Sequence, residues 1–166
     1  MANGILALMA VQGADAPATF KVSEFEFERP TQWEWVASNS PMRKAQLNVG
    51  TGDKQAEVIF YHFGPGSAGG TQANVDRWVG QFQDAKDPVV TQLDVGGHRV
   101  TIVETQGTYM SGLPAGPKTP KAGYALLGAI IEADGGSVFV KMTGPKDTVS
   151  SSGEEFRKMI RSGLEK

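Results

Sequence analysis

The chain has 166 residues, 40% of them hydrophobic, which is enough for one core of ordinary size and indicates a single domain. Its 16 basic and 18 acidic residues give a formal net charge of −2, so the composition excludes the basic surplus typical of nucleic-acid-binding proteins. Because it has no cysteine, disulfides, thiolate metal sites and cysteine nucleophiles are excluded as well.

The first sixteen residues differ in composition from the rest. An apolar run over 5–11 is followed by the small residues Ala14 and Ala16, which suit the pocket of a signal peptidase. Residues 1–16 are therefore predicted to be a signal-peptide remnant, or alternatively a disordered N-terminus, and residues 17–166 to be one α+β domain. The expected location is secreted or periplasmic. No apolar run reaches the roughly 18 residues that cross a bilayer, so the protein is not expected to be membrane-embedded.

The first third of the chain has the two-residue period of strands. The alternation from Phe20 to Phe27 predicts a strand with one wet face, and its change of phase at Ser23-Glu24 predicts a bulge or break. Trp33 and Trp35 share one parity, so we expect the following strand to bury both rings. From Ala56 to Phe63 both parities are apolar, which predicts a central strand covered on both faces.

One amphipathic helix is predicted after this strand. Its apolar positions follow the spacing i, i+3, i+4 and i+7: Val75, Trp78, Val79 and Phe82. Thr71 is the expected N-cap, and Asp87-Pro88 marks the expected exit.

Glycine-rich turns organise the second half. Gly96-Gly97 interrupts the strand pattern 89–110, and Asp134-Gly135-Gly136 interrupts the pattern 124–142, so each predicts an antiparallel hairpin. A last amphipathic helix is expected to begin at 145–148. The predicted fold class is α+β, with an antiparallel meander sheet packed with two amphipathic helices.

One irregular stretch, Ser111 to Ala122, is predicted to be an exposed loop. Its prolines at 114, 117 and 120 cannot donate ladder hydrogen bonds, and Lys118 and Lys121 are too polar to bury.

The segment Phe25-Glu26-Phe27-Glu28-Arg29-Pro30-Thr31-Gln32-Trp33 resembles the opening of PsbP-like domains. The helix around 74–82 and the closing helix fall where that family places its two sheet-packed helices, so the resemblance covers roughly residues 20–165 in element order. It implies a PsbP-like α/β/α sandwich, usually exported to a periplasm or thylakoid lumen, whose better-known members are accessory or binding proteins. No catalytic motif is matched, and the resemblance therefore assigns no functional residue.

The glycine-rich segment 64–69 matches the dinucleotide pattern G-x-G-x-x-G. That mechanism needs a parallel strand-helix-strand unit, whereas hairpins are predicted here, and Pro65 removes an amide beside the second glycine. A flexible loop entering a helix is the better interpretation. A weaker version remains: the amides of Gly69, Gly70 and Thr71 at a helix N-terminus could hold an anion, with His62 nearby.

His62 and His98 are the only histidines, and neither has a second metal ligand two to four residues away. We therefore expect no metal and no cofactor. Packed or solvent-exposed histidines are the plainer interpretation of both.

Two functional hypotheses follow. The first is a non-enzymatic, secreted or periplasmic binding or accessory domain that meets an unknown protein or small-molecule partner through the proline-rich loop, with Lys118 and Lys121 available for contact. The alternative is a small hydrolase or anion-binding enzyme around residues 64–71, with His62 as its general base.

Overall fold

The computed structural model describes residues 16–66, 69–112 and 115–165. In chain order the elements are β1 (Thr19–Val22), β2 (Phe25–Glu28), β3 (Glu34–Val36), β4 (Arg43–Val49), a 3-10 turn (Gly52–Lys54), β5 (Ala56–His62), α1 (Thr71–Gly80), β6 (Phe82–Val95), β7 (His98–Ser111), β8 (Thr119–Ile131), β9 (Val138–Pro145), α2 (Lys146–Ser151) and α3 (Gly153–Leu164). The predicted signal-peptide remnant lies almost entirely outside the described residues. No helix in the described part of the chain combines the length and hydropathy that crossing a bilayer requires.

The main sheet has seven strands in the order β3-β4-β5-β9-β8-β7-β6, and every neighbouring pair is antiparallel. Strands β3 to β5 form one meander, after which α1 carries the chain to the far edge. Strands β6 to β9 then return one by one until β9 pairs with β5. Both predicted hairpins are confirmed: β6 pairs with β7 across Gly96-Gly97, and β8 pairs with β9 across the 134–136 turn.

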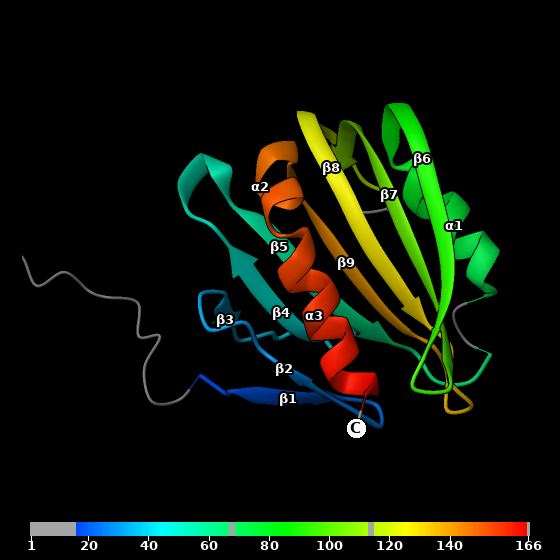
Figure 1. The fold of residues 1–166 in the computed structure, drawn as a ribbon. Helices are drawn as coiled ribbons and strands as arrows, with labels where there is room; N and C mark the ends of the chain where they lie inside the picture. Colours follow the sequence, from blue (N-terminus) through cyan, green and yellow to red (C-terminus); the bar gives the residue numbers. More distant parts are fainter. Residues whose placement is uncertain (1–15, 67–68, 113–114, 166) are drawn as a thin grey trace, which may run out of the picture.

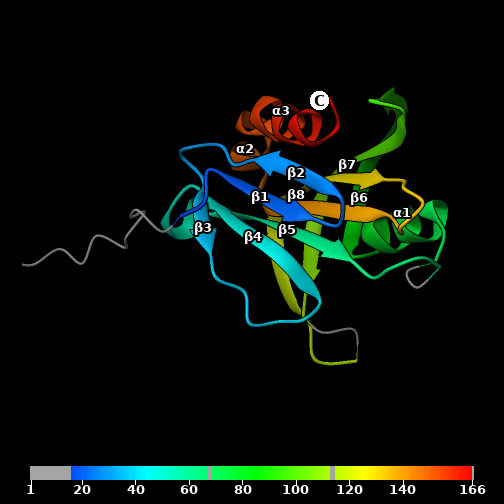
Figure 2. The same cartoon turned by 90° about the horizontal axis from the view of Figure 1, so that it is seen from below.

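Helices lie on both faces of the sheet, as Figures 1 and 2 show. Helix α1 covers part of one face, which we call the α1 face. Helices α2 and α3, together with the β1–β2 hairpin, cover the opposite face, which we call the α3 face. The predicted α/β/α sandwich is therefore confirmed.

The larger part of the core lies on the α3 face. Phe27, Phe60 and Phe156 are all completely buried there, and the rings of Phe27 and Phe60 lie 5.0 Å apart. Gly163 permits the close approach of α3 to β2, because a Cβ at this position would collide with the Phe27 ring. The core on this side thus depends on aromatic residues and on one glycine of the helix.

The α1 face is covered only in part. Val75 and Trp78 of α1 pack against Ile130 and Phe139 of the sheet. Gly128 lies directly beneath the Trp78 ring and leaves the room that the indole occupies. Beyond this cluster the face carries half-buried tyrosines and a lysine, which are described below.

The α1 helix is shorter than predicted. It ends at Gly80, and Phe82 is the first residue of β6, where its ring packs against Tyr109 at 5.2 Å. The residues Asp87-Pro88 do not mark a helix exit: Asp84 and Asp87 have positive φ angles of 53° and 44°, and they lie at irregularities in the β6–β7 ladder. An acidic residue before proline is typical both of a helix end and of an irregularity in a strand, which is why the prediction was wrong.

The N-cap prediction was also wrong. Gly70 is the N-cap of α1, and Thr71 is the first helical residue. At the other end of the chain, the predicted single terminal helix is two helices separated at Ser152.

The predictions for the early strands need two corrections. Ser23, with a φ of 54°, belongs to a tight turn that joins β1 to β2, rather than to a bulge within one strand. Trp33 is buried but precedes β3, whereas Trp35, within β3, is only half-buried. The predicted central strand is confirmed, because β5 contributes to the cores of both faces.

The predicted 111–122 loop is strand at its two ends, Ser111 and 119–122, and is corrected there. Strand β7 continues to Ser111 and β8 begins at Thr119, so that Pro120 lies opposite Met110 and Lys121 lies opposite Tyr109. Proline is tolerated in this position because β9 pairs with β8 only from Tyr124 onward, so that this end of β8 is an edge.

Candidate functional site

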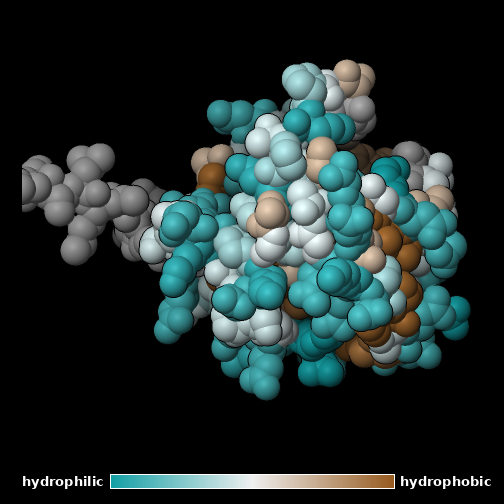
Figure 3. Space-filling view, turned by 90° about the horizontal axis from the view of Figure 1, so that it is seen from above, coloured by the Kyte–Doolittle hydropathy of each residue, from teal (hydrophilic) through white to brown (hydrophobic). Residues whose placement is uncertain are grey.

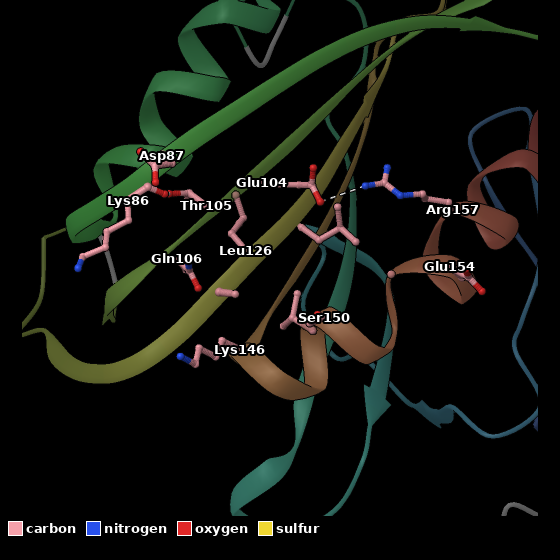
Figure 4. A pocket seen from close by; sticks show the side chains of 14 residues that line it. Lys86, Asp87, Glu104, Thr105, Gln106, Leu126, Lys146, Ser150, Glu154 and Arg157 are labelled. Atoms are coloured by element: carbon pink, nitrogen blue, oxygen red, sulfur yellow. Dashed lines mark hydrogen bonds and ion pairs between the residues drawn. The ribbon is translucent and has the colours of Figure 1, made fainter.

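A groove of about 420 Å³ lies between helices α2 and α3 and strands β6, β7 and β8. Figure 4 shows its side chains from close by. Its lining comprises Lys86, Asp87, Glu104, Thr105, Gln106, Ala125, Leu126, Leu127, Lys146, Val149, Ser150, Gly153, Glu154 and Arg157. Apolar residues of β8 and α2 form its floor, and charged residues of both signs form its rim.

One ion pair joins the two walls of this groove. Arg157 Nη2 of α3 donates to Glu104 Oε1 of β7 at 3.0 Å. The two side chains are 37% and 45% exposed, so the pair contributes only about 0–1 kcal/mol to stability. A ligand carboxylate can therefore compete with Glu104 for the guanidinium at little energetic cost.

The other end of the groove carries two amines. Lys86 comes from β6 and Lys146 from the start of α2, and in Figure 4 they extend from opposite walls toward the same end, with the Gln106 amide between them. All three side chains are exposed. This arrangement offers a hydrogen-bonding amide flanked by two cations, opposite an arginine that already holds a carboxylate.

The lining combines charged, amide and hydroxyl groups. It contains one serine, Ser150, and no histidine. Among the described residues, no three histidine or acidic side chains gather closely enough to hold a metal ion.

A second hollow, of about 570 Å³, lies where three turns of the sheets meet. His98 lines it, with Glu24, Arg99 and Glu132 nearby. The His98 ring is fixed on two sides, because Nδ1 donates to the Glu132 carbonyl oxygen at 3.0 Å and the ring meets Phe25 edge-on at 5.0 Å. These contacts give His98 a packing role.

His62 lies beside the same β8–β9 turn. Its Nε2 is 3.0 Å from the Gly135 carbonyl oxygen, and since a carbonyl only accepts, Nε2 carries the proton. The two histidines therefore contact one turn from separate strands. Neither hollow is lined by His62 or Thr71.

The predicted anion-binding residues lie at the start of α1. Gly69 has a φ of 74°, and Gly70 is followed by a helix whose first turn has no acidic residue. The Gly70 carbonyl oxygen accepts from the Asn74 amide at 3.2 Å and from Asn74 Nδ2 at 2.9 Å. These contacts secure the first turn, and the anion site at Gly69, Gly70 and Thr71 stays a prediction.

The predicted partner-binding lysines lie away from the groove. Lys118 and Lys121 are exposed at the end of the β7–β8 ribbon, which projects from the body on the side opposite α3 (Figure 2). The structure thus separates two candidate contact surfaces.

Sequence reasoning missed one cluster, on the α1 face. The half-buried Lys141 of β9 donates to Gln81 Oε1 and to Tyr109 Oη, the latter at 3.4 Å, and lies 5.3 Å from the centre of the Tyr109 ring. Burial lowers the Lys141 pKa to about 8, although the Glu57 carboxylate opposes the shift. Burial also raises the pKa of Tyr61 and of Tyr109. A lysine within the apolar run 138–142 was the available signal.

Comparisons with known proteins identify the fold. No family model matches the chain, and no curated protein matches its sequence. The chain is similar in structure to cyanobacterial PsbP (CyanoP) from Synechocystis sp. PCC 6803, with a TM-score of 0.56 and 16% identity over 90% of this chain and 94% of that one. It is also similar to the protein of unknown function PA94 from Pseudomonas aeruginosa, with a TM-score of 0.50 and 11% identity over 87% of this chain and 93% of that one. At these identities the likeness establishes a PsbP-like fold alone.

Proposed function

We propose that this protein is an exported, non-enzymatic accessory domain that binds a partner in the groove between α2–α3 and β6–β8. The observation that carries the proposal is the groove itself: an apolar floor bordered by cations and anions, with no histidine in its lining. Such a lining is suited to orienting a polar ligand and not to reacting with it.

The chemistry of the rim favours a polypeptide segment as the ligand. Lys86 and Lys146 provide donors for carbonyl or carboxylate oxygens, while Glu154 and Asp87 provide acceptors for amines and amides. A chain segment carries both kinds of group along its length, whereas a simple anion would leave the carboxylates unpaired.

The proposal that the protein is exported rests on the sequence of residues 1–16 and on the PsbP-like fold. The small-residue pattern at Ala14 and Ala16 supports processing by a signal peptidase.

The alternative enzyme around residues 64–71 has less support. His62 has its Nε2 proton directed to the Gly135 carbonyl, so only Nδ1 is left to act as a base. No carboxylate is described in hydrogen-bond contact with its ring.

The test compares two matched double charge reversals. A tagged form of the full chain is recovered from its native cells, and the co-purified partner is quantified for Lys86→Glu/Lys146→Glu in the groove and for Lys118→Glu/Lys121→Glu on the ribbon. Both change the net charge equally and alter exposed residues, so melting temperatures should stay close to that of the parent.

We expect the groove variant to lose the partner and the ribbon variant to keep it. If only the ribbon variant loses it, the contact surface is the 111–122 segment instead. A partner retained by both variants rejects the two surfaces together.

A further inference from the structure

Strand β6 forms one edge of the seven-stranded sheet and is unusually exposed. Two of its residues, Val89 and Val90, are 49% and 45% exposed although both are large and apolar. Figure 3 shows hydrophobic atoms gathered along the side of the molecule on which Figure 1 places β6. An exposed apolar edge is a template for pairing with another strand.

The β6–β7 hairpin determines which backbone groups of β6 point outward. Its two-residue turn, Gly96-Gly97, has φ angles of 57° and 83°, and the pair Val95–His98 closes it. The closing pair of such a hairpin exchanges both backbone hydrogen bonds, and hydrogen-bonded pairs then alternate along the ladder. Odd-numbered residues from 89 to 95 therefore bond to β7, and the outward N–H and C=O groups belong to Val90, Gln92 and Asp94.

We propose that two copies of this protein pair through β6, antiparallel, with Gln92 opposite Gln92 of the second copy. In this register Val90 lies opposite Asp94 of the second copy, and every outward N–H meets an outward C=O. A register shifted toward the N-terminus would require pairing by Pro88, which has no N–H. A register shifted toward the C-terminus would require pairing by the glycine turn.

Side chains support the same register on the α3 face. Val89 would lie opposite Val95 of the second copy, and Thr91 opposite its Leu93. Val95 and Leu93 already belong to the edge of the α3-face core, so the pairing extends that core across the interface and covers the exposed Val89.

The edge is protected only before this segment. Asp84 and Asp87 have positive φ angles, and Pro88 follows, so the ladder is irregular between Gln83 and Val89. Such bulges, charges and proline normally prevent unwanted edge pairing. From Val89 to Val95 the pairing with β7 is regular, and none of these devices recurs except Asp94.

The register predicts opposite effects for the same substitution at two neighbouring outward positions. Gln92→Lys places two lysines directly opposite each other, whereas Val90→Lys places each new lysine opposite Asp94 of the second copy. Sedimentation equilibrium of the full chain should show a dimer for the parent and for Val90→Lys, and a dimer weakened roughly tenfold or more for Gln92→Lys, with recovery in high salt.

A third variant tests the backbone. Gln92→Pro removes an outward N–H while leaving the β6–β7 ladder intact, so it should yield a folded monomer, with circular dichroism as the folding check. A parent that stays monomeric at the highest soluble concentration overturns the proposal, as does equal weakening by the two lysine variants. A parent that is monomeric yet takes up an added β-strand peptide would also overturn it, since the occupant would then be another chain.

Discussion

The two faces of the sheet reach stability in different ways. On the α3 face, two helices and a hairpin enclose aromatic and aliphatic residues that are almost completely buried. On the α1 face, one ten-residue helix covers a smaller cluster, and the remaining surface holds Lys141, Tyr109 and Tyr124 at half burial. The fold therefore needs only one continuous apolar core and tolerates polar groups on the other face.

The same asymmetry separates stability from binding. The proposed groove lies at the margin of the α3 face, where the helices stop short of β6 and the strand residues turn polar. The floor of the groove belongs to the buried core, whereas the exposed side chains of its rim can be substituted without loss of packing.

The largest expected effect comes from truncating the α3-face core. Phe156→Ala removes a fully buried ring from α3, and we expect a loss of roughly 3–5 kcal/mol in the free energy of unfolding. Val79→Ala, at a half-buried position of α1, is the control and should cost about 1 kcal/mol or less. Urea denaturation of both variants checks this. A loss of less than about 2 kcal/mol for Phe156→Ala would contradict this account of the α3-face core.

A smaller, pH-dependent effect belongs to the α1 face. The folded pKa of Lys141, about 8, lies below its ordinary value of 10.5, so the unfolded chain binds more protons between these values and stability should rise with pH there. Relative to Lys141→Met, the free energy of unfolding of the parent should rise by roughly 1–2 kcal/mol between about pH 7 and 9.5.

The upper limit of this window follows from the tyrosines. The pKa values of Tyr61 and Tyr109 are raised in the folded state. Their contribution to the free energy of unfolding is therefore fully present below about pH 10 and is lost only at higher pH. Denaturation at several pH values measures the trend. A parent and variant that keep a constant difference would show that Lys141 titrates as it does in water.

The smallest effect concerns a buried hydroxyl on the α1 face. Thr101 Oγ1 is buried and has no hydrogen-bond partner among the described residues. Thr101→Val keeps the shape and removes the unsatisfied group, so we expect a gain of about 1 kcal/mol in the free energy of unfolding. Thr105→Val is the control, because Thr105 Oγ1 contacts the Lys86 carbonyl oxygen at 3.4 Å. Destabilisation by Thr101→Val would indicate a bound water or a local rearrangement.

The sequence was sufficient for the elements whose signals are local. Glycine pairs predicted both hairpins, and the apolar period predicted the buried faces of the helices apart from Phe82, because turn conformation and burial depend on neighbouring residues. Asp87-Pro88 failed as a helix exit because an acidic residue before proline also suits a bulge, and only the pairing of β6 with β7 decides between them.

The candidate groove was not predictable in the same way. Lys86, Glu104 and Arg157 are far apart in the chain and meet only because β6–β8 pass beneath α2 and α3. Single exposed charges carry no periodic signal, so sequence reasoning settled on the proline-rich ribbon and on the glycines before α1.

The most direct test of the central claim, that the partner binds at the margin of the α3 face, is photocross-linking in native cells. Benzoylphenylalanine replaces Gln106 in the groove or, as the control, Asn48, which lies on the α1 side of β4. The account predicts a discrete cross-linked partner from position 106 and none from position 48. A partner captured only from position 48, or equally from both, would contradict it.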